Sequence, residues 1–373
     1  MSSKISFLSP DKDLFAQTLR SRIDGYFREK GISRYGNSYL WTKAVFYLGS
    51  YVGLYFAILS GWFSEPVMLL MAVAMGFFVA GIGFNVGHDA VHGSFSESSR
   101  INRVMGHAFT LIGANVYNWN ICHNIVHHSY TNIPEADGDL HPMPFLKFHP
   151  GGTHRPAHRY QHWYAFFLYS LTSLAWAIPK DFRHFFQRRL IAYDKPKPPV
   201  SEYFWLFGGK GAYYVAMWIV PALVLGLVWW KILIGFVAMH LVAGFMLATV
   251  FQLGHLVEGT KFTPLPDGPI PVSWMAHQIE ASANFAPSSR LALWVTGGLN
   301  FQIEHHLFPR MSHAHYPKIA EIVKTTAAEF GVNYTEYPSF LSALASHRRL
   351  LRKLGETSVA IKPPASAEIV AAA

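Results

Sequence analysis

Four apolar segments of the 373-residue chain are each long enough to cross a lipid bilayer as a helix. They occupy about residues 40–60, 66–87, 212–230 and 232–256. About 20 apolar residues in a helix cover the roughly 30 Å of hydrocarbon. The short loop 60–66 separates the first pair, and little more than Lys231 separates the second. The sequence therefore predicts an all-α integral membrane protein with four transmembrane helices, in contact with membrane lipid.

A fifth apolar run, residues 163–179, is shorter and rich in aromatic side chains. Its length suits an interfacial or re-entrant helix as well as it suits a full crossing. We leave it outside the four predicted spans because an odd number of crossings would separate the histidines described below.

Basic residues predict the orientation of the spans. The first 43 residues hold eight Lys and Arg, whereas the two hairpin loops hold only Lys231. Cytosolic segments of membrane proteins carry the excess of Lys and Arg. We therefore expect both termini, the long segment 88–211 and the active site on the cytosolic side. The net charge of +9 lies beside the apolar runs, which favours an anionic membrane surface over nucleic acid as partner.

Eight histidines lie where apolar runs end or in the segments predicted to be cytosolic. One of them, His255, stands alone at the end of the fourth run, and the others form three clusters: His88 and His92; His123, His127 and His128; His305 and His306. With four spans, all eight lie on the same side of the membrane. Imidazole is the commonest neutral metal ligand in proteins, so we expect these side chains to build a metal centre.

The spacing within the clusters favours two metal ions over one. Histidines four residues apart, such as His88 and His92 or His123 and His127, share one face of an α-helix. Adjacent histidines such as His127 and His128 point about 100° apart, so one ion does not easily bind both. Imidazole suits Zn, Cu, Ni and Fe, and these residue types alone leave the metal open.

Acidic residues beside the clusters are candidates for orienting the imidazoles. Asp89 can accept a hydrogen bond from a ligand, whereas Asp137 and Asp139 suit either this role or the capping of a loop. The single cysteine, Cys122, excludes an intramolecular disulfide. We expect Cys122 to be a small buried residue rather than a ligand.

The clusters His-Asp-Ala-Val-His, His-Asn-Ile-Val-His-His and Gln-Ile-Glu-His-His resemble the three histidine boxes of the membrane fatty-acid desaturases in order and approximate separation. The resemblance covers roughly residues 40–330. It implies a non-haem centre of two iron ions that uses O2 and two electrons to remove two hydrogens from a long acyl chain. The seven box histidines match metal ligands of the family, and His255 matches an additional one.

Gln302 occupies the first position of the third box, where many desaturases have histidine. This glutamine resembles the front-end subgroup, which places a new double bond between an existing one and the carboxyl end. Many front-end enzymes carry a fused cytochrome b5 domain. We expect none before the first span of this chain, because the segment 1–39 is too short for such a domain. The tetrapeptide beginning at His149 matches the haem motif of that domain, but we expect a turn there. The resemblance then implies a separate electron donor such as cytochrome b5 or ferredoxin.

The remaining segments complete the predicted organisation. We expect a cytosolic N-terminal segment (1–39) with an amphipathic helix over 11–30, a membrane and catalytic domain (40–330), a C-terminal cytosolic helical segment (331–356) and a disordered tail (357–373). The N-terminal helix can lie on the membrane or pack on the globular part. Pro317 and Gly331 predict the start and the end of one C-terminal helix.

Several alternatives stay open at this point. An acyl-chain hydroxylase can use the same scaffold, and a membrane metal transporter or haem-binding electron carrier belongs to another functional class. His154, His158 and His162 fit a polar surface near a lipid headgroup better than a second metal site, because Pro156 interrupts their pattern. His240 lies in the middle of a span, where we expect it to face the bundle and form hydrogen bonds. The acyl carrier, the chain length and the double-bond position are not determined by the sequence.

Overall fold

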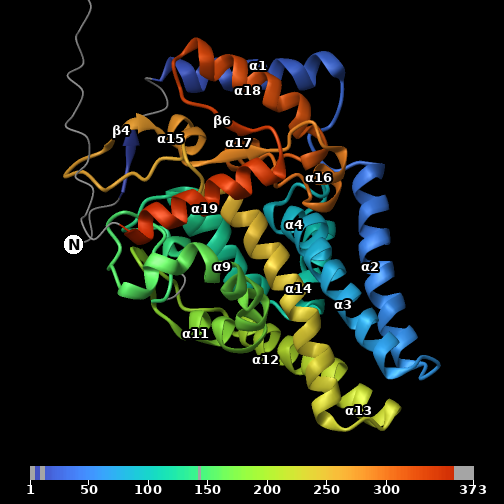
Figure 1. Ribbon diagram of the computed structural model, residues 1–373. Helices are drawn as coiled ribbons and strands as arrows, with labels where there is room; N and C mark the ends of the chain where they lie inside the picture. Colours follow the sequence, from blue (N-terminus) through green and yellow to red (C-terminus); the bar gives the residue numbers. More distant parts are fainter. Residues whose placement is uncertain (1–4, 9–12, 142–143, 357–373) are drawn as a thin grey trace, which may run out of the picture.

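The computed structural model describes residues 5–8, 13–141 and 144–356 of the chain. Within them the fold is mainly helical, with long helices below and a compact cap of shorter elements above (Figure 1). The predicted disordered tail, 357–373, lies outside the described residues.

Four helices of the described residues are long and apolar enough to span a membrane, which confirms the predicted number of spans. Two of the four contain a wider π-helical turn, at Gly83–Gly87 and at Val215–Ile219. The spans are α2 (Ser38–Leu59), α3 with α4 (Glu65–Ile82 and His88–His92), α12 with α13 (Val200–Tyr214 and Val220–Leu225) and α14 (Trp229–His255).

The predicted bounds of the third span are wrong. The helix begins at Val200 rather than near residue 212, and it ends at Leu225 because Gly226 adopts the left-handed conformation with φ of 60°. Lys210 is tolerated in this span because its Nζ lies 2.8 Å from Asp181 Oδ2 and donates to the carbonyl oxygen of Gly113. The connection is therefore 226–228 rather than Lys231, and the segment between the two helix pairs ends before residue 200.

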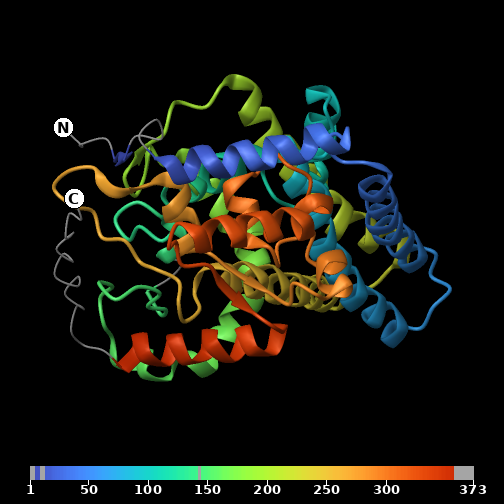
Figure 2. The same ribbon diagram turned by 90° about the horizontal axis from the view of Figure 1, so that it is seen from above.

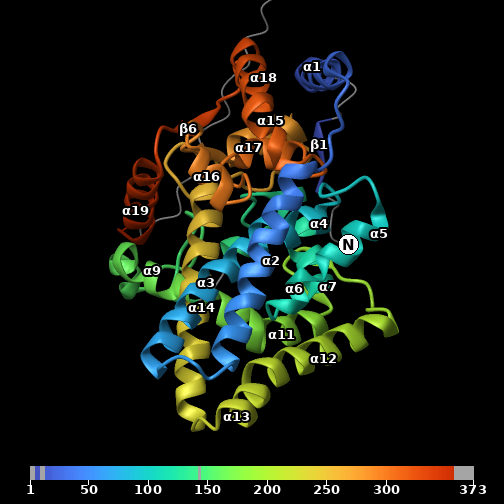
Figure 3. The same ribbon diagram turned by 90° about the vertical axis from the view of Figure 1, so that its right-hand side faces the viewer.

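The two central spans, α3 and α14, pack closely along their length, with α2 on the outer side of α3 (Figure 3). The approach requires a glycine, because a Cβ atom on Gly76 would overlap the carbonyl oxygen of Met239. This packing brings the ends of both central helices to the same place beneath the cap.

The run around 163–179 is a broken helix beside α14. Its parts are α9 (Gln161–Ser170), α10 (Thr172–Ala175), a π-helical turn (Trp176–Lys180) and α11 (Asp181–Phe186). Pro179 lies in the turn and has no N–H to donate. Lys210 donates to the carbonyl oxygens of Trp176 and Ala177 in the same turn. The run is absent from the four candidate spans among the described residues, as expected.

The cap contains the N-terminal helix and the last third of the described chain. Helix α1 (Leu14–Lys30) lies along α18 (Tyr316–Glu329), as Figure 2 shows from above. The predicted apolar face of α1 is buried, and it consists of Phe15, Leu19, Ile23 and Phe27. This helix therefore packs on the globular part. Pro317 lies in the first turn of α18, and Gly331 follows its end with φ of 69°, which confirms both helix signals.

The other helices of the described residues are shorter, apart from α19. They are α5 (Ser99–Gly106), α6 (Ala108–Leu111), α7 (Val116–Trp119), a π-helix (Asn120–His127), α8 (His128–Tyr130), α15 (Trp274–Ala281), α16 (Arg290–Val295), α17 (Gln302–Leu307) and α19 (Phe340–Glu356). Three 3-10 turns span Gly138–Leu140, Pro156–Tyr160 and His313–His315.

Three small two-stranded sheets were not expected from the sequence. Strand β1 (Phe7–Leu8) pairs in parallel with β4 (Ile270–Ser273), and β5 (Ala283–Phe285) pairs in parallel with β6 (Thr335–Tyr337). Strands β2 (Arg189–Leu190) and β3 (Tyr193–Asp194) form an antiparallel pair. Strands of two to four residues are too short to show the alternating pattern by which strands are predicted.

Candidate metal centre

All eight predicted histidines meet where the central spans end beneath the cap. Helix α4 continues α3 and carries the first cluster, and the π-helix with α8 carries the second. The third cluster lies on α17, and His255 is the last residue of α14. Each of the eight is at most 7% exposed. Three sequence clusters and one isolated histidine therefore form a single buried site.

Four of these side chains form a first group. The ligand atoms of His88, His92, His123 and His305 all lie within 4.8 Å of one another. Nε2 of His88 lies 3.3 Å from Nε2 of His123. The Nε2 atoms of His92 and His305 are buried and have no hydrogen-bond partner among the described residues. A cation between these nitrogens would satisfy lone pairs that the protein leaves unused.

A second group consists of His127, His255 and His306. Nε2 of His255 lies 3.3 Å from Nε2 of His127 and 3.1 Å from Nε2 of His306. Two nitrogens that each lie about 2.1 Å from one ion are roughly 3.0–3.4 Å apart. The geometry of the second group thus also fits a metal ion.

Burial keeps most of these imidazoles neutral. It lowers the pKa of His123, His128, His305 and His306 well below the ordinary value, and the neighbouring imidazoles lower each further. A neutral imidazole has a lone pair available for a metal, whereas an imidazolium has none.

The second cluster departs from the α-helical geometry that the spacing predicted. His123 was expected to share a helix face with His127, four residues on. In the structure its Nε2 lies 3.3 Å from Nε2 of His128, five residues on. The rings of His123 and His127 remain neighbours, with centroids 5.4 Å apart. The cause is the π-helix at Asn120–His127, because its i to i+5 hydrogen bonds widen the turn.

His128 lies between the two groups. Its ring stacks on that of His306 with centroids 4.2 Å apart, and its ligand atom lies within 4.8 Å of those of His305 and His306. The adjacent rings of His305 and His306 are nearly perpendicular, at 83°. His305 therefore belongs to the first group and His306 to the second. Of the other adjacent pair, His127 belongs to the second group, and His128 contacts members of both.

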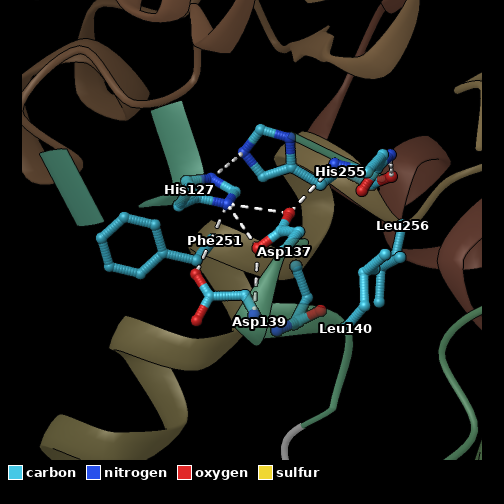
Figure 4. Close-up of a pocket in the computed structure, with 9 residues that line it drawn as sticks. His127, Asp137, Asp139, Leu140, Phe251, His255 and Leu256 are labelled. Carbon is cyan, nitrogen blue, oxygen red and sulfur yellow. Dashed lines mark hydrogen bonds and ion pairs between the residues drawn. The ribbon is translucent and has the colours of Figure 1, made fainter. Parts of the chain in front are cut away.

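Asp137 holds His127 from the side opposite to the second group, as Figure 4 shows. Nδ1 of His127 lies 3.1 Å from Asp137 Oδ2. Burial opposes ionisation of Asp137, but His127 and the backbone N–H groups of Asn132 and Asp139 lower its pKa. Burial also opposes a charge on His127, yet the two aspartates raise its pKa to about 9. Asp139 is farther, with Oδ2 3.5 Å from Nδ1, and its side chain is half exposed.

Asp89 connects the first group to a membrane helix. One of its carboxylate oxygens lies 3.6 Å from Nδ1 of His88, and the other accepts from Nδ1 of His313 at 2.7 Å. Nε2 of His313 in turn lies 2.9 Å from Nζ of Lys43 on α2. A buried chain of polar contacts thus joins Lys43, His313, Asp89 and His88.

Comparison with known protein families matches residues 60–338 to the family described as fatty acid desaturase. The chain belongs to this family. It is a membrane enzyme, a fatty-acid desaturase of the oxidoreductase class. The family expected from the three histidine boxes is confirmed, and the transporter and electron-carrier alternatives are set aside.

Full-length relatives agree with this assignment. The desaturase is 32% identical to a sn-1 linoleoyl-lipid 6-desaturase of Arthrospira platensis, over 91% of this chain and 92% of that protein. A sn-1 linoleoyl-lipid 6-desaturase of Synechocystis is 33% identical, over 92% and 96%. An acyl-lipid (8-3)-desaturase of Physcomitrium patens is 33% identical, over 95% and 74%.

The structure adds residues of the desaturase that sequence reasoning missed. Oε1 of Gln278 on α15 lies 2.9 Å from Nδ1 of His306, and Oγ1 of Thr131 lies 3.1 Å from the same atom. The hydroxyl group of Tyr316 lies 3.4 Å from Nδ1 of His305. Thr131 follows the second cluster closely in the sequence. Gln278 and Tyr316 reach the site only through the packing of α15 and α18.

Gln302 and Glu304, the two other polar residues of the third histidine box, pack against neighbouring segments. Gln302 is buried against Gly254, where a Cβ atom would overlap the glutamine side chain. Glu304 is fully buried and accepts hydrogen bonds from Asn284 Nδ2 at 2.7 Å and Tyr334 Oη at 3.0 Å. Burial raises the pKa of Glu304 to about 8. Both residues tie α17 to its neighbours in the desaturase.

Two histidines outside the centre behave as expected. His240 faces the bundle, with Nδ1 2.9 Å from Ser173 Oγ and Nε2 2.7 Å from Tyr213 Oη. The tetrapeptide at His149 forms a turn closed by a hydrogen bond from Gly152 N to His149 O, so the desaturase has no haem-domain fold there. The single cysteine, Cys122, is partly exposed. Its Sγ lies 3.1 Å from Nδ1 of His184, which is outside both histidine groups.

Proposed function

We propose that the desaturase is an O2-dependent front-end enzyme that acts on lipid-linked polyunsaturated chains. The relatives carry the proposal: proteins named linoleoyl-lipid 6-desaturase and acyl-lipid (8-3)-desaturase match more than nine tenths of this chain. Gln302 supports the same subgroup, because a glutamine at the first position of the third histidine box resembles the front-end desaturases. The product would carry a new cis double bond between an existing one and the carboxyl end.

We assign two iron ions to the two histidine groups. His88, His92, His123 and His305 would hold the first ion, and His127, His255 and His306 the second, with His128 beside both. Iron is consistent with an all-imidazole donor set. When bound, the two ions supply, with O2, the oxidising power that removal of hydrogen from an unactivated methylene demands.

The protein's own residues prepare this site in three ways. Burial of all eight histidines excludes water from the reacting positions. Asp137 and Gln278 fix the rings of His127 and His306 through Nδ1, and the Asp89 carboxylate lies 3.6 Å from Nδ1 of His88. These contacts leave Nε2 of each ring directed at the centre. Helix α4, which continues α3, and the end of α14 place His88, His92 and His255 at the boundary between the spans and the cap (Figure 1).

We propose that electrons come from a separate protein such as cytochrome b5 or ferredoxin. The histidine-proline-glycine-glycine sequence forms a turn rather than part of a haem domain, which supports this proposal. The excess of basic residues before the first span supports a cytosolic position of both termini and of the active site. A reporter fused to either terminus would test this orientation.

The decisive experiment is expression in a host of known lipid content, supplied with linoleate and a competent electron donor. Mass spectrometry of the fatty acids, with location of each double bond, should show a new cis bond on the carboxyl side of an existing one. His127→Ala should abolish the product. His141→Ala, an exposed histidine outside both groups, should keep it.

Other products would change the proposal. A hydroxylated acyl chain would favour the hydroxylase alternative, and a new bond on the methyl side would contradict the front-end assignment. A short pulse of labelled linoleate separates the carriers, because a lipid-linked substrate predicts labelled product first in glycerolipid and only later in acyl-CoA.

A further inference from the structure

Helix α9 exposes a row of aromatic side chains. Tyr160, just before the helix, and Trp163 and Phe167 within it are 59%, 63% and 65% exposed. The opposite face of α9, with Ala165 and Tyr169, is buried. Exposed aromatic rings are unfavourable in water, whereas Trp and Tyr concentrate at the boundary between membrane and water. The exposed face of α9 is therefore suited to a lipid surface.

Arginines gather beside these rings. The guanidinium carbon of Arg348 on α19 lies 3.8 Å from the centre of the Trp163 ring. Arg159 and Arg352 are exposed nearby, and Arg352 forms an ion pair with Glu356 at 2.8 Å. Within the described ranges, Arg159 and Arg348 form no ion pair with a carboxylate. At least two guanidinium groups are thus available to an anion.

The same arginines act on the neighbouring His162. Burial lowers the pKa of His162, and Arg348 and Arg352 lower it further. Both arginines therefore act on a residue of α9, although they belong to another helix. We refer to Arg159, Tyr160, Trp163, Phe167, Arg348 and Arg352 together as the basic–aromatic face.

Close contacts fix the two parts of this face to each other. Nε2 of His154 lies 2.9 Å from the carbonyl oxygen of Gly355 in the last turn of α19. Gly355 itself has no space for a side chain, since a Cβ atom would overlap the carbonyl oxygen of His158. His154 and His158, for which the sequence favoured a polar surface near a lipid headgroup over a metal site, hold the end of α19 against the turn before α9.

The position of the face matches the edge of the membrane. Helices α9 and α19 lie beside the half of α14 that is nearer to the cap (Figures 1 and 3). We propose that the basic–aromatic face binds an anionic glycerophospholipid at the membrane–water boundary. The rings contact the upper part of the acyl chains, and the guanidinium groups bind the headgroup phosphate, for which their planar donors are suited. The proposal is independent of the acyl substrate and of the double-bond position.

The test measures how much phosphatidylglycerol the full-length enzyme retains. Protein in mixed phosphatidylcholine and phosphatidylglycerol is purified in detergent, and bound lipid is quantified by mass spectrometry. The variant Arg159→Gln/Arg348→Gln/Arg352→Gln should retain at least about fivefold less phosphatidylglycerol relative to phosphatidylcholine. Arg20→Gln/Arg28→Gln/Lys30→Gln on α1 removes the same charge from the cap and should retain the wild-type amount.

Three outcomes would overturn the proposal. The first is that the arginine variant retains as much phosphatidylglycerol as wild type, and the second is that the α1 control loses as much as the arginine variant. The third is displacement of the lipid by excess inorganic phosphate, which would indicate a free-phosphate site. Iron content and elution volume check that each variant is folded. Should the triple variant fail to fold, Arg348→Gln alone, at an exposed position, should lower retention about twofold. Retention by this single variant equal to wild type would again contradict the proposal.

Discussion

Nζ of Lys43 lies 2.9 Å from Nε2 of His313, and both side chains are fully buried. Lys43 belongs to the first membrane helix, whereas His313 belongs to the cap. His313 contacts Asp89, whose other oxygen faces His88. The contact therefore connects a transmembrane helix with a proposed metal ligand through two intermediate side chains.

Lys43→Met should weaken iron binding without removing a ligand. Without the Lys43 amino group, His313 would lose one of its two polar partners and would hold Asp89 less firmly. Loss of such outer contacts typically costs about 10–100-fold in metal affinity or activity. Iron per chain after dialysis against a chelator measures the effect. Lys231→Met is the matched control, because Lys231 also lies in a span but pairs with Glu65 at the other end of the helices. Wild-type iron retention by Lys43→Met would contradict the role of this chain of contacts.

Asp137→Asn and Asp139→Asn should differ sharply. Asp137 is buried at 3.1 Å from Nδ1 of His127, whereas Asp139 is half exposed at 3.5 Å. We expect Asp137→Asn to lower iron affinity about 10–100-fold and Asp139→Asn to lower it less than about threefold. Titration of the apoprotein with ferrous iron against a coloured chelator compares the two. Equal losses would assign the orienting role to both carboxylates.

Hydropathy predicted four spans because each contains a long apolar stretch. It failed to locate the start of the third span, where a charge is neutralised by a tertiary contact. Lys210 and the glycines around it lower the hydropathy of the start of α12, so the predicted span began too late. Asp181, which neutralises Lys210, belongs to another segment. No local pattern reveals such a partner, since pairing depends on how the broken helix packs.

The residue types of the candidate site were predictable, but their pairing was not. Clusters of histidine identified the eight side chains that meet in the buried site, because imidazoles gathered at helix ends are typical of metal sites. The α-helical period placed His123 on one helix face with His127, whereas the π-helix also brings His123 to His128. Gln278 lies far from every cluster in the sequence, and it reaches His306 only because α15 packs against α17.

Gly254→Ala should disturb the second histidine group. A Cβ atom at this position would overlap the side chain of Gln302, which would push α17 away from α14 and separate His255 from His306. Overpacking of this kind typically costs about 1–3 kcal/mol, and we expect activity to fall at least about tenfold because ligand geometry is lost. Thermal unfolding and iron content of the purified enzyme measure both effects.

Gly235→Ala is the matched control for that substitution. It lies in the same helix, but the nearest atom to an added Cβ is the Cβ of Ala72 at 3.8 Å, an ordinary contact. This variant should unfold at the wild-type temperature or slightly above, since alanine favours helix over glycine by about 1 kcal/mol. Equal damage from both substitutions would show that α14 tolerates no added methyl group, and the specific role of Gly254 would be lost.

His347 should make the attachment of α19 sensitive to acid. Its Nδ1 lies 2.6 Å from the carbonyl oxygen of Leu256, and its Nε2 lies 2.9 Å from the hydroxyl group of Tyr169. The neutral ring satisfies both contacts by donating to the carbonyl and accepting from the hydroxyl. Burial lowers the pKa of His347 from 6.5 to about 4. The unfolded chain therefore takes up a proton at a higher pH than the folded protein does.

Stability from His347 is thus complete above about pH 6.5 and is lost as the pH falls toward about 4. At pH 5 the loss should be about 2 kcal/mol, since each pKa unit corresponds to about 1.4 kcal/mol. Hydrogen exchange of α19 at pH 7 and pH 5, corrected for intrinsic rates, measures this local stability. His347→Gln can keep both hydrogen bonds but cannot titrate, so its protection should change less between the two pH values. Should the glutamine variant lose as much protection as wild type, another group would be responsible for the acid sensitivity of this helix.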